Sequence, residues 1–376
     1  MRIVLTGGGT GGHFYPLIAV TEELKKEIIN QKIVGEKFFY IADKPYDTEA
    51  LYKLGIEYIE IPTGKLRLYF SLQNIFDSVK TFFAILRALV VLYKIYPDVI
   101  FSKGGYSAFP VVLAGWILRI PIVIHESDTV PGRVNKISAH FATRIAIGFP
   151  EAIEYFNKDI TALVGNPVRK EIQRPTSDGA YDYLKIDPSV PTIAIFGGSQ
   201  GAQKINDAVL AILPSLIEKY QIIHQVGMSQ LEAVTELSKS LLQESKYKER
   251  YKIFGFLGEL EQKMTAGVSR LVITRAGASG IFEVAMWGIP SITIPIAKSN
   301  GNHQVMNAYS YAHSGATLVI EEENLTPHTF EAEIDRIMND QATQSKMRQA
   351  TKSFVFPDAA QKIAKEIISI SLTHEE

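Results

Sequence analysis

The stretch that decides the fold is Ile3-Val4-Leu5-Thr6-Gly7-Gly8-Gly9-Thr10-Gly11-Gly12-His13, at the start of the chain. A short apolar run leads directly into glycines, and residues 17–24 beyond them have the apolar spacing of a helix. Glycine at a strand–helix junction lets the backbone turn tightly and approach a ligand closely. The N–H groups at the start of a helix suit a phosphate. The stretch therefore predicts a strand–turn–helix unit with an anion site at its turn.

A second pattern of strand, glycine loop and helix occurs in the second half of the chain. The apolar run 192–196 leads into Gly197-Gly198-Ser199-Gln200-Gly201-Ala202, and a helix is expected over about 204–220. Strand-like runs that alternate with helical patterns favour parallel sheets covered by helices on both faces. We therefore predict an α/β chain of two Rossmann-like domains. The further strand-like runs are 37–42, 58–61, 98–101, 122–124, 143–147, 222–225, 271–274, 291–294 and 317–320.

The expected domain boundaries follow from a change in composition. Residues 173–191 are rich in proline, glycine, serine and aspartate, which is typical of a linker or a long surface loop. We expect a first domain over 1–170, a linker over 171–190 and a second domain over 191–355. Residues 356–376 form a C-terminal helix that could pack back on the first domain.

Composition excludes several classes of protein. The 376 residues are 46% hydrophobic and 21% charged, which is an ordinary globular balance. The 39 basic and 40 acidic side chains nearly cancel, so no overall field attracts nucleic acid. The absence of cysteine excludes disulfides, thiolate zinc sites, iron–sulfur clusters and a cysteine nucleophile. The apolar run at the N-terminus is too short for a signal peptide, so none is expected.

The first glycine loop formally matches G-x-G-x-x-G at Gly7, Gly9 and Gly12. A dinucleotide enzyme should carry an acidic residue about 20 positions further on, to hold the ribose. The first acidic residue that ends a second strand is Asp43, well beyond that spacing, which disfavours a nicotinamide enzyme. Two glycine loops that open two domains nevertheless predict anion binding by at least one of them.

Further polar groups follow predicted strands, where ligands bind in α/β sheets. His13 could be a general base, a hydrogen-bond donor to phosphate or a structural residue. Glu283, in the glycine segment 274–283, could bind a ribose diol or cap a helix. Other clusters are 103–107, 125–128, Asn135 and 299–304. The chain has no Asp-x-Asp and no histidine pair at i, i+4, so we expect no dedicated divalent metal site. The run 321–323 is interpreted as a solvated loop.

The apolar stretch 81–93 is interrupted by Arg87 and is shorter than the roughly 20 residues that cross a bilayer. Basic residues and the apolar segment 66–72 lie close to it. Two interpretations stay open, namely a basic apolar surface that touches an anionic membrane and a buried helix preceded by a loop. The basic residues are Lys65, Arg67, Lys80, Arg87 and Lys94.

In combination and order, the motifs resemble those of the MurG family of bacterial glycosyltransferases. The resemblance covers nearly the whole chain. Its motifs are 7–13, 104–106, 125–126, Pro131-Gly132-Arg133-Val134-Asn135-Lys136, Gly165-Asn166-Pro167-Val168-Arg169, 197–202, 275–283 and Asn302-His303-Gln304-Val305-Met306-Asn307-Ala308.

This resemblance implies a GT-B fold, in which two Rossmann-like domains face one another across a deep cleft. It implies inverting transfer of N-acetylglucosamine from UDP-GlcNAc to the 4-hydroxyl of undecaprenyl-pyrophosphoryl-MurNAc-pentapeptide, for peptidoglycan synthesis. Neither a cofactor nor a metal is implied. The expected location is peripheral, on the cytoplasmic face of the cell membrane, with the 64–94 region on an anionic surface and no nucleic acid partner.

The resemblance also implies roles for individual residues. His13 is the favoured general base and Asp128 the competing one. Many family members carry Gln-Asn where this chain has Ser127-Asp128, so this chain departs from the family pattern on the acceptor side. The implied acceptor residues are Gly8, Gly9, Thr10, Gly11, Tyr106, His125, Glu126 and Asn135. The implied donor residues are Thr10, Gly11, Gly12, Arg169, Gly198, Ser199, Gln200, Gly201, Phe256, Leu257, Arg275, Gly277, Ala278, Ser279, Glu283, His303 and Gln304.

The alternatives to this function are a related transferase acting on another lipid acceptor, a nicotinamide-dependent oxidoreductase and a protein that only senses UDP-sugars.

Overall fold

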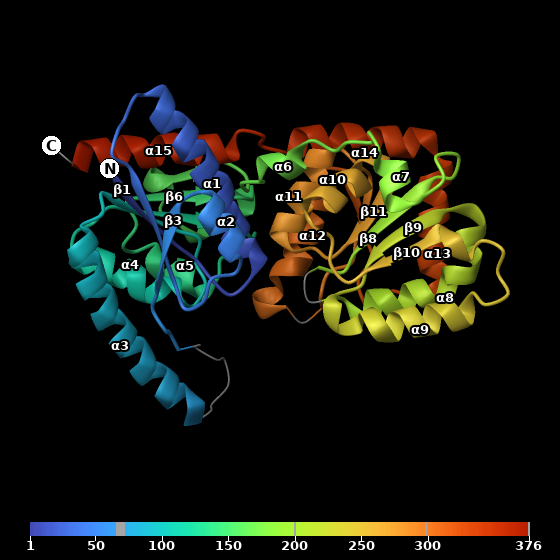
Figure 1. The fold of residues 1–376 in the computed structure, drawn as a ribbon, viewed down its shortest axis with the longest axis horizontal. Coiled ribbons are helices and arrows are strands. Elements are labelled where there is room, and N and C mark those ends of the chain that lie inside the picture. Colours follow the sequence, from blue (N-terminus) through green and yellow to red (C-terminus); the bar gives the residue numbers. More distant parts are fainter. Residues whose placement is uncertain (65–71, 199–200, 298, 375–376) are drawn as a thin grey trace. The chain divides into compact units, whose positions relative to one another are not determined.

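The computed structural model describes residues 1–64, 72–198, 201–297 and 299–374. The chain forms two compact units (Figure 1). Unit 1 comprises Met1–Arg169 and Phe356–Glu376, and unit 2 comprises Lys170–Val355. The predicted segments 66–70 and Ser199-Gln200 lie outside the described residues, as do Lys65 and Ser71.

Unit 1 is built on a parallel sheet with the strand order β3-β2-β1-β4-β5-β6-β7. Every strand pair in it is parallel, as the alternation of strands and helices predicts. The strands are β1 (Arg2–Thr6), β2 (Lys37–Ala42), β3 (Ile56–Glu60), β4 (Val99–Ser102), β5 (Ile122–Glu126), β6 (Arg144–Ile147) and β7 (Thr161–Leu163). The helices are α1 (Gly11–Asn30), α2 (Thr48–Lys53), α3 (Leu72–Ile95), α4 (Ala108–Ile117), α5 (Arg133–Ser138) and α15 (Ala359–His374), with 3₁₀ turns at Pro150–Tyr155 and Lys158–Ile160.

Both faces of this sheet are covered, which explains why β1 is apolar at consecutive positions. Ile3 and Leu5 point into a core shared with α1 and α15. Val4 points to the opposite face, into a core with α3 and α4. The C-terminal helix α15 therefore lies beside α1 as part of unit 1 (Figure 1).

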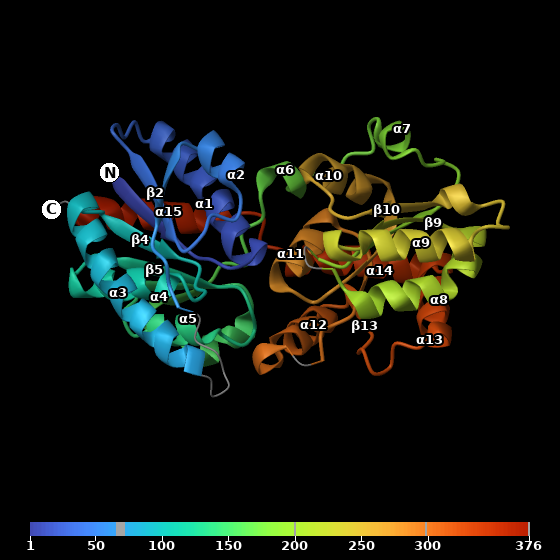
Figure 2. The ribbon, with the colours of Figure 1, turned by 60° about the horizontal axis from the view of Figure 1, so that its bottom comes forward.

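Unit 2 has a second parallel sheet, with the order β10-β9-β8-β11-β12-β13. Its strands are β8 (Thr192–Phe196), β9 (Gln221–Gln225), β10 (Tyr251–Phe254), β11 (Ser269–Thr274), β12 (Ser291–Thr293) and β13 (Thr317–Val319). Its helices are α6 (Lys170–Gln173), α7 (Ala180–Leu184), α8 (Gln203–Lys219), α9 (Leu231–Leu241), α10 (Glu259–Val268), α11 (Ala278–Trp287), α12 (His303–His313), α13 (Pro327–Asn339) and α14 (Gln341–Phe354). The helices α8 and α9 pack side by side (Figure 2).

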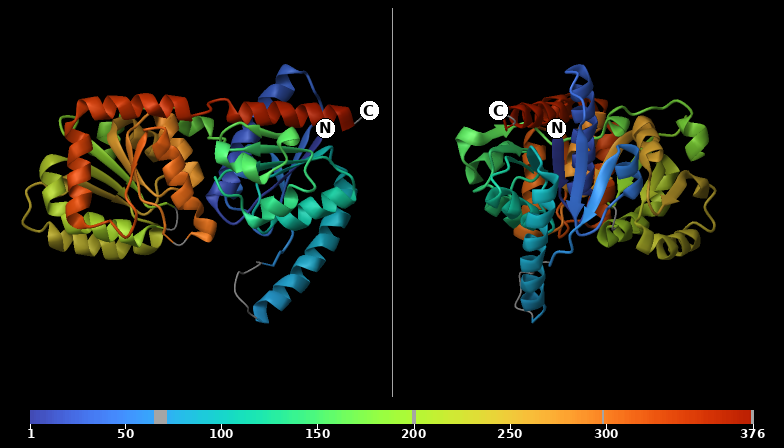
Figure 3. Two further views of the ribbon diagram at one scale, coloured as in Figure 1. Left: turned by 180° about the vertical axis from the view of Figure 1, so that it is seen from behind. Right: turned by 60° about the vertical axis from the view of Figure 1, so that its left-hand side comes forward.

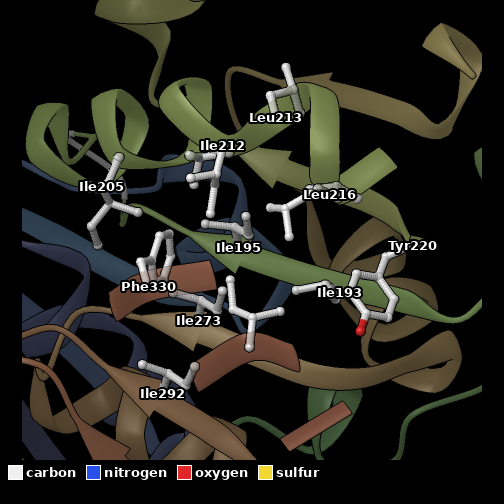
Figure 4. Close-up of a cluster of buried hydrophobic side chains, with 14 of the residues drawn as sticks. Ile193, Ile195, Ile205, Ile212, Leu213, Leu216, Tyr220, Ile273, Ile292 and Phe330 are labelled. Carbon is white, nitrogen blue, oxygen red and sulfur yellow. The ribbon is translucent and has the colours of Figure 1, made fainter. Parts of the chain in front are cut away.

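Strand β8 has the same two-faced burial as β1. Ile193 and Ile195 pack against Leu216 of α8 and its neighbours (Figure 4). Ala194 and Phe196 point into the other core, with α7 and α11. Residues 171–190 contain α6 and α7, whose Ile172, Ala180 and Leu184 are buried in unit 2. This segment is thus folded against the second sheet, although its composition suggested a linker.

In both units the direction of strand addition reverses beside the first strand. In unit 1 the reversal lies between β1 and β4, and Thr6 is paired with Ser102. In unit 2 it lies between β8 and β11, and Phe196 is paired with Thr274. Ligands of open α/β sheets bind outside the carboxyl ends of the strands at such a switch point. Each predicted glycine loop begins at the switch point of its own unit.

Candidate active site

In unit 1, the first glycine loop packs against the loop that follows β4. Gly105 has φ +84°, and a Cβ there would lie 2.5 Å from the carbonyl oxygen of Gly8. A Cβ on Gly8 would lie 2.2 Å from the Ser107 Oγ. The two loops approach this closely because both carry glycine, so Gly8, Gly9 and Tyr106 share one end of the sheet.

Tyr106 connects this turn to the end of β2. Its hydroxyl donates a hydrogen bond to Asp43 Oδ2 at 3.1 Å, and its ring lies 3.3 Å from the Cβ position of Gly9. Burial, together with the Asp43 charge, raises the pKa of Tyr106 to about 12. The other Asp43 oxygen accepts a hydrogen bond from the Thr63 N–H at 3.1 Å and lies 3.9 Å from the Lys80 ammonium. Tyr106 is therefore a neutral hydrogen-bonded phenol at neutral pH.

His125 and Glu126, predicted to bind the acceptor, are both buried at the end of β5. His125 Nε2 lies 2.9 Å from the carbonyl oxygen of Gly165. Burial, with the neighbouring Lys103, holds the pKa of His125 well below its usual value. Burial, with the Asp128 charge, raises the pKa of Glu126. These two buried side chains therefore support the candidate site from within unit 1.

Glu126 organises the loop that carries Asp128 and Asn135. Its carboxylate accepts hydrogen bonds from the N–H of Asp128 at 2.9 Å and from the N–H of Gly132 at 3.1 Å. The Asn135 amide donates to Glu126 at 2.9 Å and to the carbonyl of His125 at 3.1 Å. The structure thus brings His125, Glu126, Asp128 and Asn135 into one network.

His13 lies in the first turn of α1. The imidazole Nδ1 of His13 is 3.0 Å from Thr10 Oγ1, and the backbone N–H of His13 donates to the carbonyl of Thr10 at 3.1 Å. Thr10 thereby fixes the orientation of the imidazole ring. Arg169 is also beside α1, because its guanidinium lies 3.8 Å from the centre of the Tyr15 ring.

In unit 2, the second glycine loop is held by a buried glutamine that ends β9. The Gln225 amide donates to the carbonyl of Gly198 at 3.2 Å and accepts from the N–H of Leu257 at 3.4 Å. Gly201 has φ +79°, and a Cβ there would lie 2.5 Å from the Val226 carbonyl oxygen. Gly198, Gly201 and Leu257 therefore belong to one cluster. Phe256, beside Leu257, is half exposed.

Arg275 follows β11 on the other side of the switch point. Its guanidinium lies 2.7 Å from Glu322 Oε1, and Lys204 at the start of α8 lies 3.2 Å from Glu322 Oε2. Burial alone would raise the pKa of Glu322, but the two cations outweigh it and lower that pKa. The interpretation of 321–323 as a solvated loop was wrong for Glu322, whose side chain is only 8% exposed, whereas Glu323 is exposed as expected.

The remaining predicted donor residues lie on α11 and α12. Gly277 is the N-cap of α11, Ala278 and Ser279 are in its first turn, and Glu283 is partly exposed one turn further on. The Gln304 side chain accepts a hydrogen bond from the N–H of Ile296 at 3.1 Å. His303 begins α12, next to Gln304. These two helix N-termini belong to the same sheet edge as the second glycine loop, because α11 and α12 follow β11 and β12.

Lys103 and Gln225 are structural members of these two sites. Lys103 belongs to the predicted polar cluster 103–107, although no role was assigned to it, whereas Gln225 was predicted only as part of a strand. Each is buried just at or beyond the end of a central strand and holds several loops by hydrogen bonds. A polar residue at the carboxyl end of an otherwise apolar strand is the signal that marks both. Within the described part of the chain, no three histidine, aspartate or glutamate side chains are grouped as a metal site.

Two parallel α/β units, each with a glycine turn at its switch point, are the architecture of a GT-B glycosyltransferase. Solved structures share this fold. The crystal structure of Acinetobacter baumannii MurG has a TM-score of 0.72 at 24% identity, covering 98% of this chain and 99% of that chain. UDP-GlcNAc 2-epimerase from Neisseria meningitidis bound to UDP-GlcNAc has a TM-score of 0.67 at 14% identity, covering 98% and 100%.

Sequence comparison narrows the class. Residues 3–147 match the glycosyltransferase family 28 N-terminal domain, and residues 192–363 match its C-terminal domain. A relative from Bacillus cereus is 34% identical over 97% of this chain and 99% of its own length. One from Lachnoclostridium phytofermentans is 35% identical over 99% of both. Both are UDP-N-acetylglucosamine–N-acetylmuramyl-(pentapeptide) pyrophosphoryl-undecaprenol N-acetylglucosamine transferases. The chain belongs to this MurG family of glycosyltransferases.

Proposed function

We propose that the chain transfers N-acetylglucosamine from UDP-GlcNAc to the 4-hydroxyl of MurNAc in undecaprenyl-pyrophosphoryl-MurNAc-pentapeptide. The observation that carries this proposal is the pair of glycine turns at the two switch points, because each substrate brings its own diphosphate group. Family membership supports the same pair of substrates, which the names of the relatives state.

In this proposal unit 2 takes the donor. The diphosphate lies at the turn that contains Gly198 and Gly201, near the N-termini of α8 and α11. The backbone at Phe256 meets the uracil and Glu283 holds the ribose. Negative charge develops on the leaving UDP in the transition state, and preorganised N–H groups and helix dipoles stabilise it.

Unit 1 takes the acceptor, whose pyrophosphate lies at the first glycine turn. The hydroxyl of MurNAc attacks the anomeric carbon from the face opposite UDP, which gives a β-1,4 bond. His13 accepts the hydroxyl proton at Nε2, which requires that its Nδ1–H donate to Thr10 Oγ1 across the 3.0 Å contact. Asp128 is the competing base, held by its N–H to Glu126.

The test is transfer of labelled N-acetylglucosamine from UDP-GlcNAc to the lipid-linked muramyl-pentapeptide, in the presence of EDTA. We expect transfer, and we expect Glu283→Ala to raise the KM for UDP-GlcNAc far more than that for the acceptor. Folded wild-type protein that transfers nothing, or only to a different lipid, refutes the proposal. A larger effect of Glu283→Ala on the acceptor KM reverses the assignment of the two units.

We also propose that α3 docks on the cytoplasmic surface of an anionic membrane. The helix buries Ala84, Ala88 and Leu92 in unit 1 but leaves an apolar stripe on its other side, so the interpretation of 81–93 as a buried helix holds for one face only. Figure 3 shows α3 projecting from the rest of unit 1. The stripe consists of Phe76, Val79, Phe82, Phe83, Leu86, Val90 and Tyr93, which are 43–77% exposed.

The charge on α3 supports an anionic partner. The helix carries three basic residues, Lys80, Arg87 and Lys94, and one acidic residue, Asp77. An amphipathic helix with basic residues beside its apolar face binds anionic lipid surfaces. Among the residues that the structure describes, no helix is both long and apolar enough to span a bilayer. Peripheral docking would bring unit 1 to the lipid that carries the acceptor.

Vesicle flotation tests this docking. The double variant Phe82→Ser/Phe83→Ser should bind phosphatidylglycerol vesicles at least about tenfold more weakly than the wild type, because two exposed rings lose their lipid contact. The matched control is Leu237→Ser/Leu241→Ser on α9, whose side chains are 50% and 42% exposed. Equal losses in both double variants, or none in either, would contradict docking through α3.

A further inference from the structure

Lys103 is a buried cation at the switch point of unit 1. Its side chain is among the largest fully buried side chains, and the residue is 2% exposed. The backbone N–H of Lys103 donates to the carbonyl of Thr6 at 2.8 Å, and a Cβ on Gly7 would lie 3.0 Å from the Lys103 Cβ. The first glycine loop therefore rests directly on this residue.

The ammonium of Lys103 has three acceptors, which lie at the end of β5, in the loop after β5 and in the loop after β7. It lies 2.6 Å from His125 Nδ1 and 3.3 Å from Asn166 Oδ1, and it donates to Ser127 Oγ. An ammonium has three N–H donors and no acceptor, so three acceptors satisfy it fully. Since His125 Nδ1 accepts from Lys103, its Nε2–H donates to the Gly165 carbonyl at 2.9 Å. One side chain thus joins the loops after β4, β5 and β7.

The charges around Lys103 stabilise its protonated form, although burial opposes it. Burial lowers the pKa of Lys103 to about 8 even though the carboxylates of Glu126 and Asp128 counteract part of the fall. The titratable groups that face it are His125, which is neutral, Glu126 and Asp128. The ammonium is therefore charged at neutral pH and loses its proton under mildly alkaline conditions.

We propose that Lys103 is a positioning residue for the acceptor half of the transfer reaction. By holding Ser127 and His125 it fixes the backbone that carries Asp128 and Glu126, and by supporting Gly7 it fixes the turn that takes the acceptor pyrophosphate. This inference rests on the proposed function. Loss of the ammonium would leave the donor site of unit 2 intact but would misplace the acceptor groups.

The first test compares Lys103→Met with the wild type in steady-state kinetics for both substrates. Misplacement of reacting groups by about 1 Å can reduce the rate by about 10²-fold. We expect kcat/KM for the acceptor to fall by about that factor, while the affinity for UDP in calorimetry stays within about twofold. A kcat/KM for the acceptor within threefold of the wild-type value would overturn the proposal.

Two measurements keep the test decisive if Lys103→Met fails to fold. The first is Ser127→Ala, which removes one acceptor of the ammonium and should lower kcat/KM for the acceptor with no change in UDP affinity. The second is the pH profile of the wild type, in which kcat/KM for the acceptor should fall above about pH 8 while UDP affinity does not. Lys103→Arg should keep its activity above that pH, because guanidinium stays protonated.

A normal acceptor kcat/KM in Ser127→Ala, or a flat wild-type profile up to pH 9.5, contradicts the proposal. A wild type that transfers no sugar at any pH refutes the proposed function itself. The two failures are therefore distinguishable, because the variants are compared only with a wild type that transfers.

Discussion

His224 is expected to make unit 2 sensitive to acid. The residue is fully buried in β9, and its Nδ1 lies 2.8 Å from the Tyr251 hydroxyl. Burial lowers the pKa of His224 from 6.5 to about 3 in the folded state. Above pH 6.5 the imidazole is neutral in both the folded and the unfolded state, so it adds no pH dependence. Below that pH only the unfolded state takes up the proton, and stability falls.

The size of this effect follows from the two pKa values. Each unit of pH between 6.5 and 3 costs about 1.4 kcal/mol of unfolding free energy, so going from pH 7 to pH 5 costs about 2 kcal/mol. His224→Leu should remove that loss. The variant can be less stable than the parent at pH 7, and the predicted quantity is the difference between the two pH values.

The assay uses the two tryptophans of the chain, because Trp116 lies in unit 1 and Trp287 in unit 2. Trp287 is 8% exposed and donates its Nε1–H to the carbonyl of Ile172 at 2.7 Å. Urea unfolding of a Trp116→Phe background, followed by Trp287 fluorescence, therefore reports on unit 2. Tyr251→Phe is the matched control, since it removes the partner hydroxyl and keeps the imidazole. A pH dependence in His224→Leu equal to that of the parent would refute the reasoning.

Three further predictions concern single contacts. Gly105→Ala should lower transfer activity strongly, because its Cβ meets a carbonyl oxygen at 2.5 Å, whereas Gly35→Ala, with a similar φ and nothing within 4 Å, should leave kcat/KM unchanged. Glu322→Gln should destabilise unit 2 by about 2 kcal/mol and raise the KM for UDP-GlcNAc, because two cations lose their counter-ion. The control is Asp335→Asn on α13, which removes a partner of Lys219 at the other end of α8 and should leave that KM unchanged. Ile367→Ala should destabilise unit 1 by about 3 kcal/mol, measured by urea unfolding followed by the fluorescence of Trp116. An unfolding transition equal to that of the parent would contradict a place for α15 in the core of unit 1.

The parallel sheets could be predicted because their central strands are buried on both faces. Runs such as 3–5 and 192–196 are then continuously apolar and directly precede glycine turns. Strand β10 was not predicted, because Tyr251–Phe254 is a short edge strand with Lys252 in it. Strand β7 is one residue shorter than β10 and lies at an edge of the other sheet.

The candidate site was predictable where its residues follow strands, because the carboxyl ends of parallel strands meet at one edge. Contacts between distant segments were not. Glu322 looked solvated because its partners, Lys204 and Arg275, are remote in sequence. The apolar stripe of α3 looked like a core face because composition does not distinguish a buried face from an exposed one.

The return of the C-terminal helix to unit 1 has a consequence for synthesis on the ribosome. Helix α15 contributes Ile363, Ala364, Ile367 and Ile368 to the core that contains Ile3 and Leu5 of β1. All of unit 2 lies between these two segments in sequence. Until α15 has left the exit tunnel, one face of the N-terminal sheet is covered by α1 but lacks the α15 part of its core, and the later-encoded unit has its complete sequence first. During that interval chaperones can bind the apolar surface that α15 later covers.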